Sequence, residues 1–328
     1  MPADGHTTYG LQIQPRVGFF TDTTVCIGCK ACEVACKEWN LVPEDGLNWT
    51  GKSYDNTQQL DANTWRHVAF IEQRKPVRVR SDDASQSASW GAAGGAGPEG
   101  TVQGRTGPQS TVPPAASVGG EAGLRPAGAD DGQGGDFRWL MSSDVCKHCT
   151  HAGCLDVCPT GAIFRTEFGT VVIQDDVCNG CGYCVTACPF GVIGKRELGG
   201  DGGMHKCTLC YDRLEEGHEP ACAKACPTDS IQFGSLDELL ERANGRLESL
   251  HEAGVEDARL YGANPEDGVG GFGAFFLLLD EPEVYGLPPD PVVPTKNLGQ
   301  IWGAVAAAAA VVAAGVAVAL AGGGDDVR

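Results

Sequence analysis

The stretch Cys178–Gly194 reads CNGCGYCVTACPFGVIG and places four cysteines at the spacing C-x2-C-x2-C-x3-C, directly before a proline. The other twelve of the sixteen cysteines form three similar groups, and no cysteine is left over. Four residues separate the second and third cysteines in the second group, and eleven do so in the fourth. In chain order the groups are Cys26, Cys29, Cys32 and Cys36; Cys146, Cys149, Cys154 and Cys158; Cys178, Cys181, Cys184 and Cys188; and Cys207, Cys210, Cys222 and Cys226.

This spacing is typical of proteins that bind 4Fe–4S clusters in pairs. Three cysteines in a short loop wrap one corner of a cubane, and Gly28, Gly180 and Gly182 let backbone N–H groups approach the sulfurs. The fourth cysteine lies on a segment that turns the other way, so it ligates the second cluster of the pair. A proline follows the group in three cases, whereas the first group has Lys37 there. The pattern predicts four 4Fe–4S clusters.

Zinc and disulfides are the alternatives for so many cysteines. Tetrahedral zinc needs only two close pairs, fewer ligands than these groups supply. Disulfides favour scattered spacings, and the N-terminus lacks both a basic segment before an apolar run and a twin arginine, so we expect no export signal of its own. His148 and His151 lie between ligands, but all four cysteines of that group are present. We therefore expect these histidines to lie beside the ligands or at the surface, and not to form a Rieske centre.

The segments around the cysteines predict an α+β fold of two ferredoxin-like modules. Between Cys158 and Cys178 two short β-type runs meet near Phe168–Gly169, which predicts a hairpin linking the halves of one module. After the fourth group, Ser235–Glu238 is a capping box that begins a helix with apolar residues at helical spacing. The run Gly273–Asp280 predicts a buried strand. Because clusters replace much of the core, folding should depend on them.

The composition changes sharply within the chain. Between Ser81 and Gly135, 35 of 55 residues are Gly, Ala, Ser or Pro, which predicts a long insertion loop without a core of its own. The predicted organisation is an N-terminal arm at 1–20, one module at 21–80 and 196–235 with cysteine groups one and four, the insertion at 81–135, a second module at 136–195 with groups two and three, a helix, strand and extended segment at 236–300, and a membrane helix at 301–322.

The run Trp302–Ala321 contains twenty residues without a charge. A helix of that length spans about 30 Å, the thickness of the hydrocarbon layer of a bilayer. An alanine-rich soluble helix is the alternative, but this run is apolar all round and would need complete burial. We therefore expect a single transmembrane anchor.

Charge and motif content exclude several functions. With 24 Lys and Arg against 43 Asp and Glu, the formal net charge is −19, so nucleic acid is not an expected partner. No nucleophile elbow, Walker loop, dinucleotide fingerprint or carboxylate dyad is evident, so we expect no autonomous catalytic site. The lysines beside ligands could raise cluster potentials, but single lysines are more often solvated at the surface; they are Lys30, Lys147, Lys206 and Lys224.

Several longer motifs resemble a known family. CIGCKACEVACKEWN, KCTLCYDR and GVGGFGAFFLLLDEPEVYGLPPDP, ahead of a C-terminal apolar helix, are similar to the iron–sulfur β subunits of respiratory formate dehydrogenases. These belong to the four-cluster β subunits of molybdopterin oxidoreductases. The resemblance covers most of the chain, excepting the N-terminal arm and the 81–135 insertion.

The resemblance implies which cysteines share a cluster, because in the family the first group pairs with the fourth and the second with the third. The four implied sets are Cys26, Cys29, Cys32 and Cys226; Cys207, Cys210, Cys222 and Cys36; Cys146, Cys149, Cys154 and Cys188; and Cys178, Cys181, Cys184 and Cys158.

The resemblance also implies partners. A molybdopterin or tungstopterin α subunit would oxidise formate, and electrons would cross this chain to a quinone-reducing membrane γ subunit of the cytochrome b or NrfD type. The soluble part would face outward beside the membrane lipid, although the flanking charges leave a cytoplasmic orientation open. The alternative is the β subunit of a dimethyl sulfoxide, thiosulfate or nitrate reductase.

Overall fold

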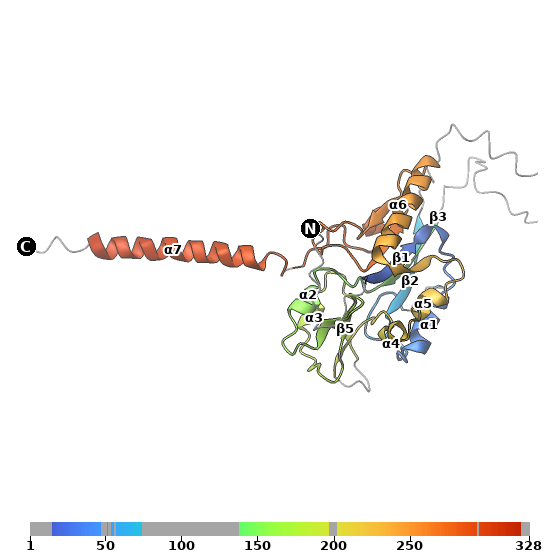
Figure 1. The fold of residues 1–328 in the computed structure, drawn as a ribbon, viewed down its shortest axis with the longest axis horizontal. Coiled ribbons are helices and arrows are strands. Elements are labelled where there is room, and N and C mark those ends of the chain that lie inside the picture. Colours follow the sequence, from blue (N-terminus) through green and yellow to red (C-terminus); the bar gives the residue numbers. More distant parts are fainter. Residues whose placement is uncertain are drawn as a thin grey trace, which may run out of the picture.

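The computed structural model describes residues 15–46, 51, 54–55, 57–73, 138–196, 202–293 and 295–322. The predicted 81–135 insertion and most of the 1–20 arm lie outside the described residues. Figure 1 shows a folded body from which one long helix extends.

A four-stranded sheet with the strand order β8-β1-β10-β9 lies at the centre of the body. Strand β10 pairs in parallel with β1 and antiparallel with β9, while β8 pairs antiparallel with β1. All five residues of β10 are buried, as the apolar run predicted. The strands are β1 (Val17–Asp22), β8 (Ile231–Ser235), β9 (Arg259–Tyr261) and β10 (Ala274–Leu278).

Helix α6 (Leu236–Glu252) packs against β1 and begins where the capping box predicted. Its capping residue Ser235, however, makes no capping hydrogen bond with its side chain. Ser235 is also the last residue of β8, and the Leu236 N–H donates to the carbonyl of Arg16 at 2.9 Å. The chain just before β1 therefore satisfies the first N–H of the helix, whereas the bond expected between the Ser235 side chain and an N–H further into the first turn is not formed.

Two pairs of short helices carry the cysteine groups. Helix α1 (Ala31–Trp39) packs against α5 (Ala221–Lys224), with α4 (Tyr211–Glu215) nearby in Figure 1. Helix α2 (Gly153–Asp156) packs against α3 (Tyr183–Ala187). The first group thus meets the fourth, and the second meets the third.

Three two-stranded ladders complete the body. Strands β4 (Ile163–Arg165) and β5 (Val171–Ile173) form the hairpin predicted across Phe168–Gly169. Strands β2 (Arg66–Gln73) and β3 (Arg138–Val145) pair antiparallel along their whole length. The remaining elements are β6 (Gly194–Lys195) paired with β7 (Met204–His205), and the 3-10 helices η1 (Thr23–Val25) and η4 (Pro282–Tyr285).

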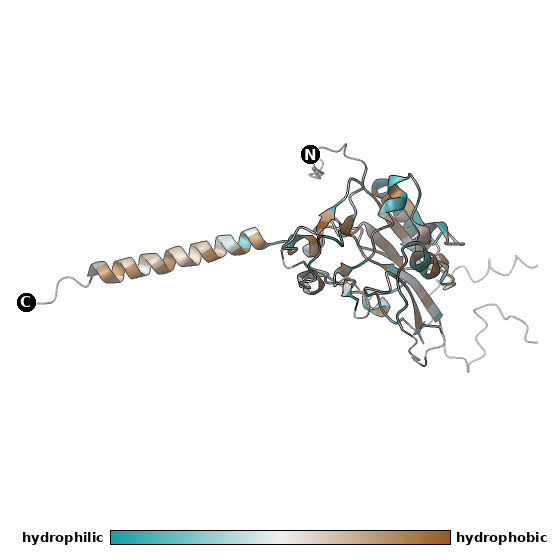
Figure 2. Cartoon of the chain, turned by 90° about the horizontal axis from the view of Figure 1, so that it is seen from below, coloured by the Kyte–Doolittle hydropathy of each residue, from teal (hydrophilic) through white to brown (hydrophobic). Residues whose placement is uncertain are grey.

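Helix α7 (Leu298–Gly322) extends away from the body. Its span Leu298–Leu320 has a mean hydropathy of 2.3 and is 0% buried, and in Figure 2 the colour of hydrophobic residues covers most of its length. Among the described residues it is the one helix long and apolar enough to cross a membrane. It begins three residues before the predicted start of the anchor.

Candidate iron–sulfur sites

One hollow joins the first cysteine group to the end of the fourth. Cys26, Cys29 and Cys32, which precede or begin α1, line it together with Cys226, which follows α5. Its empty volume is about 290 Å³. The loop around it is tight: Gly28 has φ +64°, and a Cβ there would lie 2.6 Å from Cε1 of Phe70.

A second hollow of the same empty volume, about 290 Å³, joins the second group to the end of the third. Cys146, Cys149 and Cys154 line it together with Cys188. The further lining residues include two lysines and several apolar side chains but no acidic residue; among them are Lys147, Lys206 and Phe190.

The other eight thiols also approach one another in two sets. Burial, followed by the nearby thiols of Cys207 and Cys222, raises the pKa of Cys36 well above its usual value. The side-chain amide of Asn40 lies 3.8 Å from Cys36 Sγ and 3.7 Å from Cys210 Sγ, so it spans this set.

The last set belongs to the second and third groups. Burial raises the pKa of Cys184 to about 11, and the thiols of Cys178, Cys181 and Cys158 also act on it. The Met204 N–H donates to Cys178 Sγ at 3.4 Å. Donors to ligating sulfurs are a regular feature of iron–sulfur sites.

The donor sets fit clusters better than single ions. Within the described part of the chain, no group of three or more Cys, His, Asp or Glu side chains is arranged to hold one metal ion. Instead, four thiols line each of the two hollows, which matches the number of ligands of a 4Fe–4S cluster. Burial raises the pKa of Cys32 to about 11 and that of Cys207 to about 12, so iron binding, which requires thiolates, releases protons.

Two of the lysines that we expected to be solvated at the surface are buried. Lys147 is 1% exposed, pairs with Asp144, and lies 5.3 Å from the Phe190 ring and 5.0 Å from that of Phe276. Lys206 is 2% exposed and donates to the carbonyl of Cys207 at 2.9 Å. Lys224, with 71% of its side chain exposed, does match the solvated expectation.

The histidines act as structural residues. His148 is buried, and its Nδ1 accepts from the Val171 N–H at 3.0 Å. Burial, then the charges of Lys206 and Arg16, hold the pKa of His148 well below its usual value, so the ring is neutral. His151 is exposed. Both positions agree with the expectation that neither histidine replaces a cysteine ligand.

Sequence reasoning missed one buried cation altogether. Arg66 begins β2, is 2% exposed, and its guanidinium carbon lies 4.9 Å from the centre of the Phe19 ring. The residues around Arg66 in the sequence would look the same if this arginine were exposed at the end of a strand. Its burial beside the clusters is indicated only by its pairing with Val145, the residue before Cys146, and that pairing is not visible in the sequence.

Comparison with known proteins supports 4Fe–4S clusters as the cofactor. Two family models described as 4Fe-4S dicluster domains match residues 25–162 and 137–236. The nitrate-inducible formate dehydrogenase iron–sulfur subunit of Escherichia coli is 35% identical over 285 residues, which covers 86% of this chain and 75% of the relative. The formate dehydrogenase iron–sulfur subunit of Haemophilus influenzae is 35% identical over 276 residues, or 83% and 68% of the two chains. One subunit of the anaerobic dimethyl sulfoxide reductase of Escherichia coli is 29% identical over 228 residues, or 69% and 77%.

Proposed function

Because the chain belongs to the family of formate dehydrogenase iron–sulfur subunits, an electron-transfer family with four 4Fe–4S clusters, we propose that its cysteines hold the clusters in crossed sets. The observation that carries this proposal is the lining of the two hollows, in which three cysteines of one group meet the last cysteine of another. The sets are Cys26, Cys29, Cys32 and Cys226 (site 1); Cys36, Cys207, Cys210 and Cys222 (site 2); Cys146, Cys149, Cys154 and Cys188 (site 3); and Cys158, Cys178, Cys181 and Cys184 (site 4).

Electrons cross between the modules from site 2 to site 3. After burial, the thiol of Cys146 is the strongest influence that raises the pKa of Cys207, so ligands of these two sites lie close together. Short separation favours this step over one between the outer sites. When bound, each cluster takes up and releases an electron, and the chain supplies its placement and insulation from water.

The position of α7 indicates the direction of electron transfer through the four sites. Val293 packs against Gly153, next to Cys154, and the Thr295 hydroxyl donates to Asp156 just before α7 begins. Figure 1 shows α2 and α3 on the side of the body from which α7 extends, with α1, α4 and α5 on the far side. Sites 3 and 4 therefore face the membrane subunit, and sites 1 and 2 face the catalytic subunit.

The partners follow from the family and from this direction. A molybdopterin or tungstopterin subunit oxidises formate and delivers electrons at site 1, where Cys29 is exposed. A membrane subunit of the cytochrome b or NrfD type takes them up beside α7 and reduces quinone. The soluble body lies on the outer face of the membrane.

Formate reduction of the purified complex tests this function. Formate should bleach the visible cluster absorption of the complex, and it should not affect this chain alone, because the recognised motifs of this chain bind clusters and none is expected to bind formate. Bleaching of the isolated chain by formate would contradict the proposal. If dimethyl sulfoxide reoxidised the reduced complex and formate never reduced it, the reductase suggested by the 29% relative would replace it.

A further inference from the structure

Arg66 is a buried cation whose hydrogen-bonding capacity is largely unused by the protein. Its Nη1 donates to the Ser143 carbonyl at 3.2 Å and to the Ser143 hydroxyl at 3.1 Å. Its Nε and Nη2 are buried and find no hydrogen-bond acceptor among the described residues. An uncompensated buried charge strongly destabilises the folded state. A compensating negative group is therefore expected beside it.

The groups that act on Arg66 are thiols of two different sites. Burial alone lowers the pKa of the guanidinium, but neighbouring cysteines outweigh burial and leave the pKa above its usual value. In decreasing order of influence these are Cys222, Cys32, Cys207 and Cys36. Cys32 belongs to site 1, and the other three belong to site 2.

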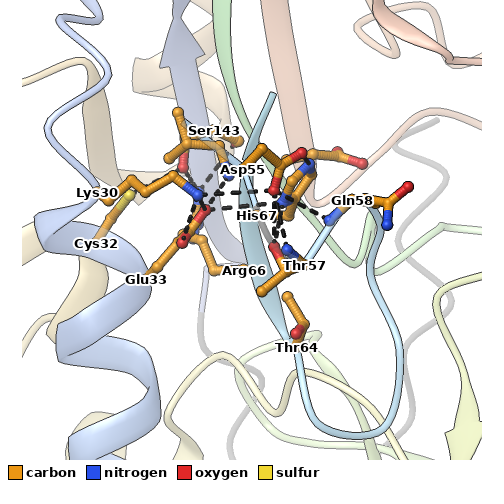
Figure 3. Close-up of polar contacts among 12 residues, drawn as sticks. Lys30, Cys32, Glu33, Asp55, Thr57, Gln58, Thr64, Arg66, His67 and Ser143 are labelled. Carbon is orange, nitrogen blue, oxygen red and sulfur yellow. Dashed lines mark hydrogen bonds and ion pairs between the residues drawn. The ribbon is translucent and has the colours of Figure 1, made fainter. Parts of the chain in front are cut away.

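Ser143 connects Arg66 to one of these sulfurs directly. The Ser143 hydroxyl lies 3.2 Å from Cys32 Sγ (Figure 3). A ligating thiolate can only accept a hydrogen bond, so the hydroxyl donates to the sulfur while its oxygen accepts from Arg66. Arg66 thereby orients the Ser143 proton toward site 1.

A polar network fixes the strand that carries Arg66. His67, the next residue, has Nδ1 3.7 Å from Glu33 Oε1 and Nε2 3.4 Å from Asp55 Oδ2. The Val68 N–H donates to Glu33, which lies on α1 next to Cys32. Figure 3 shows Glu33, His67 and Asp55 joined by dashed lines beside the start of β2. The start of β2 is thus tied to the ligand-bearing helix, and the guanidinium cannot swing to solvent.

We propose that Arg66 is a positioning residue shared by sites 1 and 2, which holds thiolates of both sites and favours the reduced state of both clusters. Reduction adds negative charge to a cluster, and a fixed cation at short range in a buried region stabilises that charge. The inference rests on the crossed cysteine sets proposed above. It adds a function for a residue that ligates neither cluster.

Redox titration followed by electron paramagnetic resonance tests the proposal on the full chain with its clusters. Signals from sites 1 and 2 are first identified as those altered by Cys29→Ser and Cys210→Ser. Arg66→Met should then lower the reduced-to-oxidised ratio of both clusters at least tenfold at a fixed potential. For a one-electron couple, this change corresponds to a reduction potential about 59 mV lower. Sites 3 and 4 should keep their potentials.

Three further variants separate charge from structure. Ser143→Ala should lower the potential of site 1 alone, because its hydroxyl contacts only Cys32 among the proposed ligands. Arg66→Lys keeps the charge and should shift both sites less than Arg66→Met does. Arg242→Met removes the same charge from the exposed face of α6 and should change nothing.

Each outcome is decisive. If Arg66→Met assembles only about half of the iron while the signals of sites 3 and 4 persist, the shared role is supported. Unchanged potentials at sites 1 and 2 would overturn it, as would equal loss of all four signals in both Arg66 variants, which would indicate a general role in folding. If Cys226→Ala and Cys222→Ala instead alter the same signal, the proposed cluster sets are refuted before any Arg66 variant is made.

Discussion

Replacing Cys226 with alanine tests crossed ligation, because Cys226 lines the hollow of site 1 while Cys222, four residues earlier, belongs to site 2. Cys222 lies on α5 and Cys226 lies two residues after its end, so Cys222→Ala is a closely matched control. Each substitution removes one ligand of one cluster. The expected loss is therefore up to a quarter of the iron, or four of about sixteen ions per chain.

The pattern of loss is more informative than its size. Cys226→Ala should lose or alter the same electron paramagnetic resonance signal as Cys29→Ala, almost two hundred residues away in sequence, and Cys222→Ala should affect a different signal. The double variant Cys226→Ala with Cys29→Ala should lose no more iron than either single variant, about a quarter. Cys226→Ala with Cys222→Ala should lose about half, because the two losses are independent.

Iron analysis and spectra of the dithionite-reduced proteins give the answer. Matching spectra for Cys226→Ala and Cys222→Ala, with Cys29→Ala distinct, would show that each group ligates its own cluster. The reasoning from the lining of the hollow would then be wrong.

Two other predictions concern the membrane helix and the ligand loops. A chain that ends at Gln300 should keep its clusters but leave the membrane fraction on a mild salt wash, since α7 is 0% buried in the body; solubility of the full chain without detergent would count against an anchor. Gly180→Ala should prevent the cluster of site 4 from assembling, because the new Cβ would lie 2.1 Å from the Gly202 carbonyl oxygen. Gly182→Ala, at φ +79° but with its nearest neighbour at 4.0 Å, should keep the iron at a cost of about 1–2 kcal/mol; equal iron loss in both variants would refute this steric argument.

Local patterns in the sequence predicted the local parts of the fold. The β4–β5 hairpin, the start of α6 and the buried strand β10 all follow from periodicity and turn residues over short windows. The parallel pairing of β10 with β1, in which Phe19 faces Ala274, joins segments about 250 residues apart, and no local pattern specifies such a partner. The capping hydrogen bond expected of the Ser235 side chain is absent, and the contact of the Leu236 N–H with the distant Arg16 carbonyl is again one that no local pattern specifies.

For the candidate sites too, some features could be predicted from local sequence and others could not. The number and type of clusters follow from spacing, because the ligands of one corner lie within a few residues of each other. The assignment of each fourth cysteine to a particular partner came from family resemblance, since spacing indicates only that this cysteine points elsewhere. The burial of Arg66, Lys147 and Lys206 could not be predicted, because it depends on thiols and rings that tertiary packing brings to them.

Anaerobic analysis of iron, acid-labile sulfide and zinc in the purified chain tests the central claim most directly. Four clusters predict about sixteen iron and about sixteen sulfide ions per chain, with little zinc. Stoichiometric zinc without inorganic sulfide would contradict the account, because the cysteines would then hold structural zinc ions and the chain would have no means of carrying electrons.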